Sequence, residues 1–149
     1  MAISSAICSS FKQELLQGKH SLDTSGNGGD TFKLALFTSS ASLGAATTAY
    51  STSNEVSGTG YSAGGTALTN TGVGLTSTTA FTDFSDVSFT SASFTANGCL
   101  IYNTTTAGGS GTTNAVCAIA FGGDKTVSSG TFTIQFPTND SSSAIIRLT

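Results

Sequence analysis

The residues Gly60-Tyr61-Ser62-Ala63-Gly64 match the G-x-S-x-G pattern of a nucleophile elbow. In such an elbow the serine lies on a strained turn between a strand and a helix, and a histidine later in the chain acts as its base. The one histidine of this sequence, His20, comes earlier in the chain, and no helical pattern follows Gly64. A serine hydroxyl without a base is a poor nucleophile. The sequence therefore argues against a hydrolase that uses Ser62.

Two further segments contain parts of known motifs. Ser9-Ser10-Phe11-Lys12 fits S-x-x-K, but neither K-T-G nor S-D-N accompanies it. Gly122-Gly123-Asp124-Lys125-Thr126 is similar to the end of a phosphate-binding loop, yet Asp124 stands where the loop needs glycine and would repel phosphate. We expect Lys12 to lie on a solvated helix face and residues 122–126 to form a turn between two strands.

Two groups of acidic residues could bind a cation or act on a sugar. Asp23, Asn27 and Asp30 lie in a glycine-rich stretch and offer oxygen ligands of the kind that Ca²⁺ prefers. Asp83 and Asp86 could form the carboxylate pair of a glycosidase, but the chain has no tryptophan to stack on a sugar ring. We expect a surface loop in the first case and a solvated pair in the second.

The cysteines do not have the spacing of a metal site. Cys8, Cys99 and Cys117 are odd in number and far apart in the sequence, which makes a disulfide framework a poor explanation. Cys117 shares a strand face with apolar neighbours such as Ile119 and is predicted to be a small buried hydrophobe. His20 has no acid or metal ligand beside it in the sequence. We predict no cofactor, no metal and no enzyme activity.

The chain carries little charge. Of its 149 residues, 38% are hydrophobic and 9% charged, with a formal net charge of −3, and its length fits one domain. The basic residues are spread along the chain, whereas nucleic-acid binding needs a cluster of them. No apolar run approaches the roughly 20 residues of a membrane span, and the N-terminus lacks the pattern of a signal peptide. We expect a soluble protein that is made without export and binds neither nucleic acid nor membrane.

One short helix is predicted near the N-terminus. Ser10 and Gln13 have the spacing of a capping box, and Gly18 could end the helix in the left-handed conformation. Phe11, Leu15 and Leu16 form an apolar stripe that must contact either the body of the fold or a neighbouring chain. We expect residues 1–22 to form an N-terminal arm and these three residues to make an inter-subunit or capsid contact.

The rest of the chain, residues 23–149, has the pattern of a single β domain. Alternation of apolar and polar residues predicts about eight short strands and, with so little helix, an antiparallel β-sandwich that is jelly-roll-like. Asn97-Gly98 is the best hairpin turn by composition, and Ala41–Gly60 and Thr106–Thr113 are predicted loops. The predicted strands are Thr31–Phe37, Tyr61–Leu68, Ala80–Phe84, Val87–Thr95, Cys99–Asn103, Ala115–Phe121, Thr131–Phe136 and Ala144–Leu148.

The outward faces of these strands carry threonine and serine rather than lysine and glutamate. A monomeric surface normally carries more charge. Few charges suit a face that packs against other subunits, because few ions must be desolvated there. They also suit an extracellular shell protein, so composition alone leaves both interpretations open.

Several blocks of sequence, taken in order, resemble a family of small virion proteins of tailed bacteriophages, including cyanophages and marine phages. Some of its members look like capsid decoration (cement) proteins. The blocks cover nearly the whole chain: residues 11–16 (FKQELL), 29–44 (GDTFKLALFTSSASLG), 54–61 (NEVSGTGY), 63–65 (AGG), 121–125 (FGGDK) and 130–137 (GTFTIQFP).

The resemblance implies a trimeric β-sandwich set on the outside of the phage head, made in the host bacterial cytoplasm. Its partners would be the major capsid protein and two further copies of itself. The alternative is a tail or tailspike receptor-binding module, in which loops such as Ala41–Gly60 contact a host glycan. The resemblance brings no catalytic or cofactor-binding residues with it.

Overall fold

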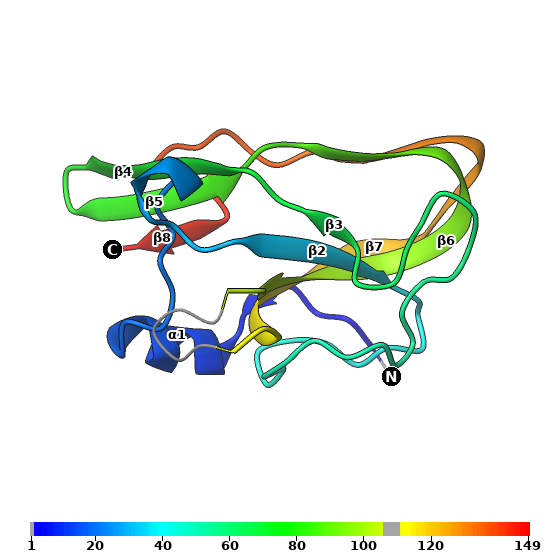
Figure 1. Ribbon diagram of the computed structural model, residues 1–149, viewed down its shortest axis with the longest axis horizontal. Coiled ribbons are helices and arrows are strands. Elements are labelled where there is room, and N and C mark those ends of the chain that lie inside the picture. The colour runs from blue at the N-terminus through cyan, green and yellow to red at the C-terminus, as the bar shows by residue number, and fades with distance from the viewer. Residues whose placement is uncertain (1, 106–110) are drawn as a thin grey trace.

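The computed structural model describes residues 2–105 and 111–149. It contains two antiparallel sheets and one short α-helix, which confirms the predicted all-β fold class (Figure 1). One sheet has the order β1-β7-β6-β2-β3 and the other the order β4-β5-β8. The elements are β1 (Ala6–Ile7), α1 (Ser9–Leu16), the 3-10 turn η1 (Ser25–Asn27), β2 (Phe32–Phe37), β3 (Thr66–Ala67), β4 (Asn70–Thr76), β5 (Thr79–Phe84), β6 (Val87–Asn103), β7 (Asn114–Ile134) and β8 (Ile146–Leu148).

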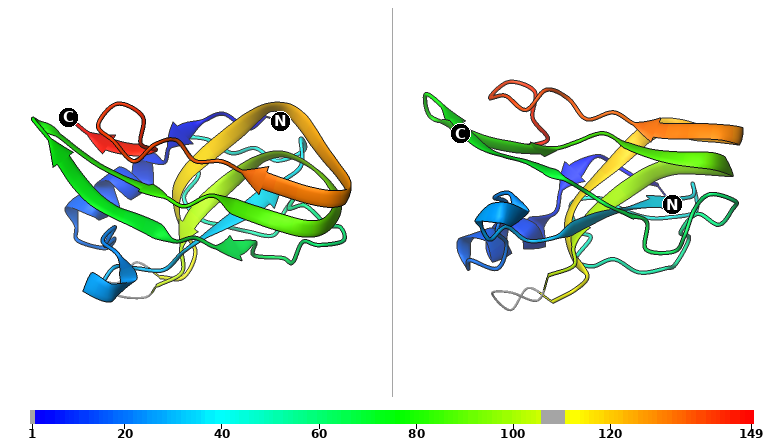
Figure 2. Two further views of the ribbon diagram at one scale, coloured as in Figure 1. Left: turned by 90° about the horizontal axis from the view of Figure 1, so that it is seen from above. Right: turned by 45° about the horizontal axis from the view of Figure 1, so that its top comes forward.

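The two longest strands, β6 and β7, pair along almost their whole length and bend together, so each contributes to both layers of the sandwich (Figure 2). The prediction of a hairpin turn at Asn97-Gly98 is wrong, because both residues lie inside β6. Gly98 is needed there for close packing: a Cβ atom would lie 2.6 Å from the carbonyl oxygen of Ile119. A glycine that permits close approach was mistaken for a turn glycine.

The predicted turn at residues 122–126 is also part of a strand. These residues lie inside β7, where the strand bends between its two halves. Gly122 and Gly123 have φ values of 76° and 141°, which L side chains rarely adopt, and this explains the glycine pair. The strands predicted as Ala115–Phe121 and Thr131–Phe136 are therefore one strand, Asn114–Ile134.

Other strand predictions differ in extent. The segment predicted as Tyr61–Leu68 is a strand only over Thr66–Ala67, whereas β5 and β8 agree in place with the predicted strands. Strand β4 was missed because its glycines and threonines do not give a clear apolar alternation. Of the predicted loop Thr106–Thr113, residues 106–110 lie outside the described part of the chain.

The helix begins at Ser9, two residues before the start that a cap at Ser10 predicts. The N-cap residue is Cys8 and no side chain caps the helix, so the predicted capping box is wrong. The hydroxyl of Ser10 is instead buried, with no hydrogen-bond partner among residues 2–105 and 111–149. The predicted stop at Gly18 is confirmed, since its φ is 71° and its N–H donates to the carbonyl of Leu15.

The predicted N-terminal arm packs into the body of the protein. Strand β1 pairs with β7, and the N–H of Cys8 donates to the carbonyl of Val116. Phe11 is 1% exposed and belongs to the hydrophobic core together with β2 and the second half of β6. Residues 2–22 and the rest of the described chain therefore share one core.

Candidate functional site

The structure does not bring the candidate catalytic residues together. Ser62 is exposed on a turn in which the N–H of Gly65 donates to the carbonyl of Ser62. The contacts of the His20 ring are with Glu14, Asn103 and Phe11, and none is with Ser62. The His20 ring therefore lies against other residues than Ser62.

The loop that could have bound Ca²⁺ uses its carboxylates internally. Asp30 is buried and accepts hydrogen bonds from the backbone N–H of Ser21 at 2.8 Å and the Asn103 side chain at 2.7 Å. Asp23 accepts from the backbone N–H of Thr24. Within residues 2–105 and 111–149, no three His, Cys, Asp or Glu side chains gather in a way that could hold a metal ion.

The predicted solvated pair of Asp83 and Asp86 is wrong for Asp83, whose side chain is fully buried. Its carboxylate accepts hydrogen bonds from the N–H groups of Phe84 and Ile145, which joins β5 to the segment before β8. Burial raises the pKa of Asp83, and these two hydrogen bonds offset only part of that rise. Asp86 is exposed and accepts a hydrogen bond from the N–H of Phe136. The two carboxylates thus have structural roles in separate hydrogen bonds.

All three cysteines are buried and free, and the prediction that Cys117 is a buried hydrophobe is confirmed. Burial raises the pKa of Cys8 to about 11 and that of Cys99 to about 12, and it raises the pKa of Cys117 well above its usual value. Thiols of this kind are protonated at neutral pH and react slowly.

A polar network that sequence analysis missed surrounds His20. Its Nε2 lies 2.6 Å from the carboxylate of Glu14, and its Nδ1 accepts from the side-chain amide of Asn103 at 2.9 Å. Asn114 donates to the other oxygen of Glu14 at 2.9 Å, and Asn103 also donates to Asp30. Each polar group faces another residue of the chain, so the network holds α1, β6 and β7 together.

A second cluster joins the three tyrosines of the chain around one carboxylate. Tyr50 and Tyr61 donate to Glu55 at 2.7 and 2.6 Å, and the N–H of Gly64 donates to it at 2.7 Å. Tyr102 stacks on Tyr50 and donates to the carbonyl of Gly64. Burial, followed by the contact with Glu55, raises the pKa of Tyr61 and Tyr50. No periodic pattern could predict this cluster, because Tyr50 and Glu55 lie in a long loop.

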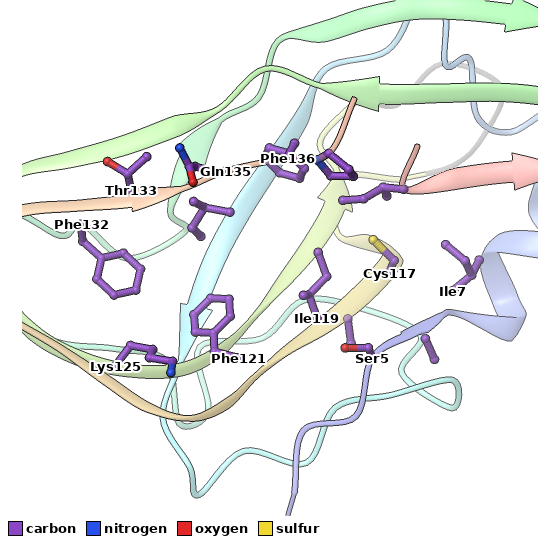
Figure 3. Close-up of a pocket in the computed structure, with 15 residues that line it drawn as sticks. Ser5, Ile7, Cys117, Ile119, Phe121, Lys125, Phe132, Thr133, Gln135 and Phe136 are labelled. Atoms are coloured by element: carbon purple, nitrogen blue, oxygen red, sulfur yellow. The ribbon is translucent and has the colours of Figure 1, made fainter. Parts of the chain in front are cut away.

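An apolar groove with a volume of about 780 Å³ lies between the two halves of β7, which precede and follow the bend at residues 122–126 (Figure 3). Ile119 and Phe121 extend into it from the first half and Phe132 from the second half. The one charged residue in its lining is Lys125. The groove is lined by Ser5, Ala6, Ile7, Cys117, Ala118, Ile119, Phe121, Lys125, Phe132, Thr133, Ile134, Gln135, Phe136, Pro137 and Ile145.

The three residues predicted to contact a partner differ in exposure. Phe11 is a core residue of its own chain and offers no surface to a partner, which corrects its predicted role. Leu15 is partly buried against the core, and Leu16 is 92% exposed at the end of α1. Val73, Leu75 and Leu148 are the other large apolar residues that the described chain exposes. Leu16 therefore retains a predicted contact role.

Comparison with known proteins gave no relative: no family model, no curated protein and no solved structure matches this chain. In the part of the chain that the structure describes, no helix is long and apolar enough to cross a membrane.

Proposed function

We propose that this protein is a non-catalytic structural protein of a tailed-phage virion, bound as a homotrimer to the outside of the head shell. The resemblance of its sequence blocks to phage virion proteins suggests this role. The observation that supports it most directly is the open apolar groove beside β7, which has a single charged lining residue. Grooves of this kind on otherwise polar surfaces are typical of interaction sites.

A decoration protein stabilises a shell by contacting several subunits at once. Such contacts gain free energy mainly from apolar area removed from water. The protein has apolar surface available for this in the groove and at Leu16, Val73, Leu75 and Leu148. With only 9% charged residues, few ions need to be desolvated.

The alternative is a tail or tailspike module that binds a host glycan. Sugar-binding sites favour exposed aromatic faces with free polar groups nearby. Here the hydroxyls of Tyr50, Tyr61 and Tyr102 are engaged by Glu55 and by the Gly64 carbonyl. This arrangement favours the decoration role over glycan binding.

Quantitative mass spectrometry of purified virions tests the proposal through the copy number of this protein relative to the major capsid protein. We expect a ratio near one per shell subunit or a simple fraction of it. A few copies per particle would indicate the tail and favour receptor binding, and absence from the virion would refute both roles.

A further inference from the structure

The groove lies between two strand edges. Consecutive residues line both of its sides, Phe132–Pro137 on one and Ser5–Ile7 on the other. The first of these sides begins with residues 132–134, the last residues of β7, and the second contains β1. In the described chain, the second half of β7 pairs only with β6, and β1 pairs only with the first half of β7.

A free strand edge has unpaired N–H and C=O groups and can accept another strand. Most free edges are shielded by charge or proline, yet residues 131–134 of β7 contain neither. Pro137 and Phe136, whose N–H donates to Asp86, lie beyond the end of the strand. The groove shown in Figure 3 therefore borders the free edge of the second half of β7, where a strand could be added. Such a strand would also cover the apolar side chains of Ile119 and Phe132.

The charge of the groove is asymmetric. Lys125 lies at the end where the rings of Phe121 and Phe132 meet, with ring centroids 6.1 Å apart. Its ammonium group makes no ion pair within residues 2–105 and 111–149. No carboxylate lines the groove. An acidic group would therefore be favoured at this end and a basic one disfavoured.

We propose that the groove binds an extended segment of the shell subunit, added as a strand to the free edge of β7. Alternate apolar side chains of that segment enter the groove, and an acidic residue lies opposite Lys125. This mode of recognition gains affinity from backbone hydrogen bonds and specificity from the pockets for alternate side chains. The source of the segment rests on the proposed function, whereas the chemistry of the groove does not.

The first test uses two probe peptides, Ac-Val-Thr-Val-Thr-Val-Glu-NH2 and the same peptide with lysine in place of glutamate, titrated by calorimetry at low salt. The glutamate peptide should bind at least about threefold more tightly, a difference typical of an exposed ion pair. Lys125→Glu should reverse the preference. Lys12→Glu makes the same charge change on the exposed face of α1 and should leave the preference unchanged.

A groove variant provides the second test. Ile134→Asp should weaken binding of both peptides about tenfold or more, with the circular dichroism spectrum confirming that the fold is retained. Lys125→Glu keeps the test valid even where Ile134→Asp fails to fold, because Lys125 is exposed. The proposal would be overturned if the two peptides bind equally or if neither shows saturable binding. Loss of self-association in Lys125→Glu would also overturn it, because a second copy of the chain would then be the occupant of the groove.

Shells purified without this protein separate the inference from the proposed function. We expect the unmodified protein and Lys12→Glu to bind these shells and Lys125→Glu to bind several-fold more weakly. Equal shell binding by all three would overturn the groove inference and leave the decoration role standing. Peptide selectivity that depends on Lys125 without any shell binding would overturn the shell as the source of the segment and the decoration role with it.

Discussion

His20 donates a hydrogen bond from Nε2 to the carboxylate of Glu14, with the two atoms 2.6 Å apart. The direction of this bond follows from the other side of the ring, where Nδ1 accepts from the side-chain amide of Asn103. The ring also packs against Phe11, with centroids 4.9 Å apart. Because Asn114 donates to the same carboxylate, His20 and Glu14 together connect the helix to the end of β6 and the start of β7.

Replacing His20 with alanine should destabilise the protein by about 3 kcal/mol, because Glu14 and Asn103 each lose a partner in a buried environment. Urea unfolding followed by circular dichroism measures this change. The neighbouring Lys19 is a matched control, since Lys19→Ala should change the free energy of unfolding by less than about 0.5 kcal/mol. Equal stability of the His20→Ala variant and the unmodified protein would contradict this role.

The network around His20 shows where sequence reasoning reaches its limit. Periodicity in the sequence located α1, β2 and β5, although in the structure burial alternates along neither strand, and Phe11 is the one buried residue of α1. The contact between His20 and Glu14 spans six residues and depends on how the chain turns at Gly18. His20 also contacts Asn103, the last residue of β6, and Glu14 also contacts Asn114, the first residue of β7. Long-range pairing of this kind is not encoded in local alternation.

The predictions for the two long strands, β6 and β7, failed for a related reason. Asn97-Gly98 and residues 122–126 have the composition of turns, yet both lie within strands. At Gly98 the glycine allows another backbone to approach, and at Gly122 it allows a bend. The local sequence indicated that these positions require glycine. Whether the glycine forms a turn, permits a close backbone contact or permits a bend depends on how the two layers pack. The groove depends on this bend and was therefore not predictable either.

Replacing Glu55 with alanine should destabilise the protein by about 3 kcal/mol. The carboxylate accepts hydrogen bonds from Tyr50, Tyr61 and Gly64, and all three donors lose a partner. Tyr102→Phe is the matched comparison, because it removes a single hydrogen bond to the Gly64 carbonyl and should cost about 1 kcal/mol. Chemical unfolding of both variants measures the difference, and equal losses would show that Glu55 does not organise the cluster.

The pH dependence of stability should reflect Asp83. Burial raises its pKa, so the native state binds this proton more tightly than the unfolded chain does. The contribution of Asp83 is therefore greatest below the ordinary carboxyl pKa and is lost as pH rises through the raised pKa. The difference in Tm between the unmodified protein and Asp83→Asn should grow in favour of the unmodified protein as pH falls from about 7 to about 3.

Asp140 provides a control of opposite sign. Hydrogen bonds from the N–H groups of Ser142 and Ser143 lower its pKa. Its contribution is therefore present above the ordinary carboxyl pKa and is lost as pH falls through the lowered value. The Tm difference between the unmodified protein and Asp140→Asn should shrink over the same pH range. Parallel slopes for the two variants would contradict the assignment of Asp83.

The three thiols should not react in the native state. With a pKa of about 11, roughly one Cys8 side chain in a thousand is a thiolate at pH 8, and burial limits access further. Native protein treated with a thiol-reactive disulfide reagent should release no colour within minutes, whereas protein in guanidinium should release three equivalents. Rapid reaction of one thiol in the native state would mean that a segment covering it opens readily.

A substitution at Leu16 tests whether the N-terminal helix makes the predicted contact. Removing residues 1–18 would also remove β1 and the core residue Phe11, so a loss of assembly in such a truncation would reflect unfolding. Leu16→Glu avoids this problem, because a side chain that is 92% exposed contributes little to folding and the change in unfolding free energy should stay below about 0.5 kcal/mol. We expect this variant to form trimers or bind shells more weakly, since a charge must be desolvated at the contact.

Sedimentation velocity measures trimer formation and co-sedimentation with shells measures shell binding, with Leu16→Met as the conservative control. Unchanged assembly and shell binding in Leu16→Glu would show that the exposed end of α1 makes neither contact, which would leave the groove and the other exposed apolar residues as the candidates.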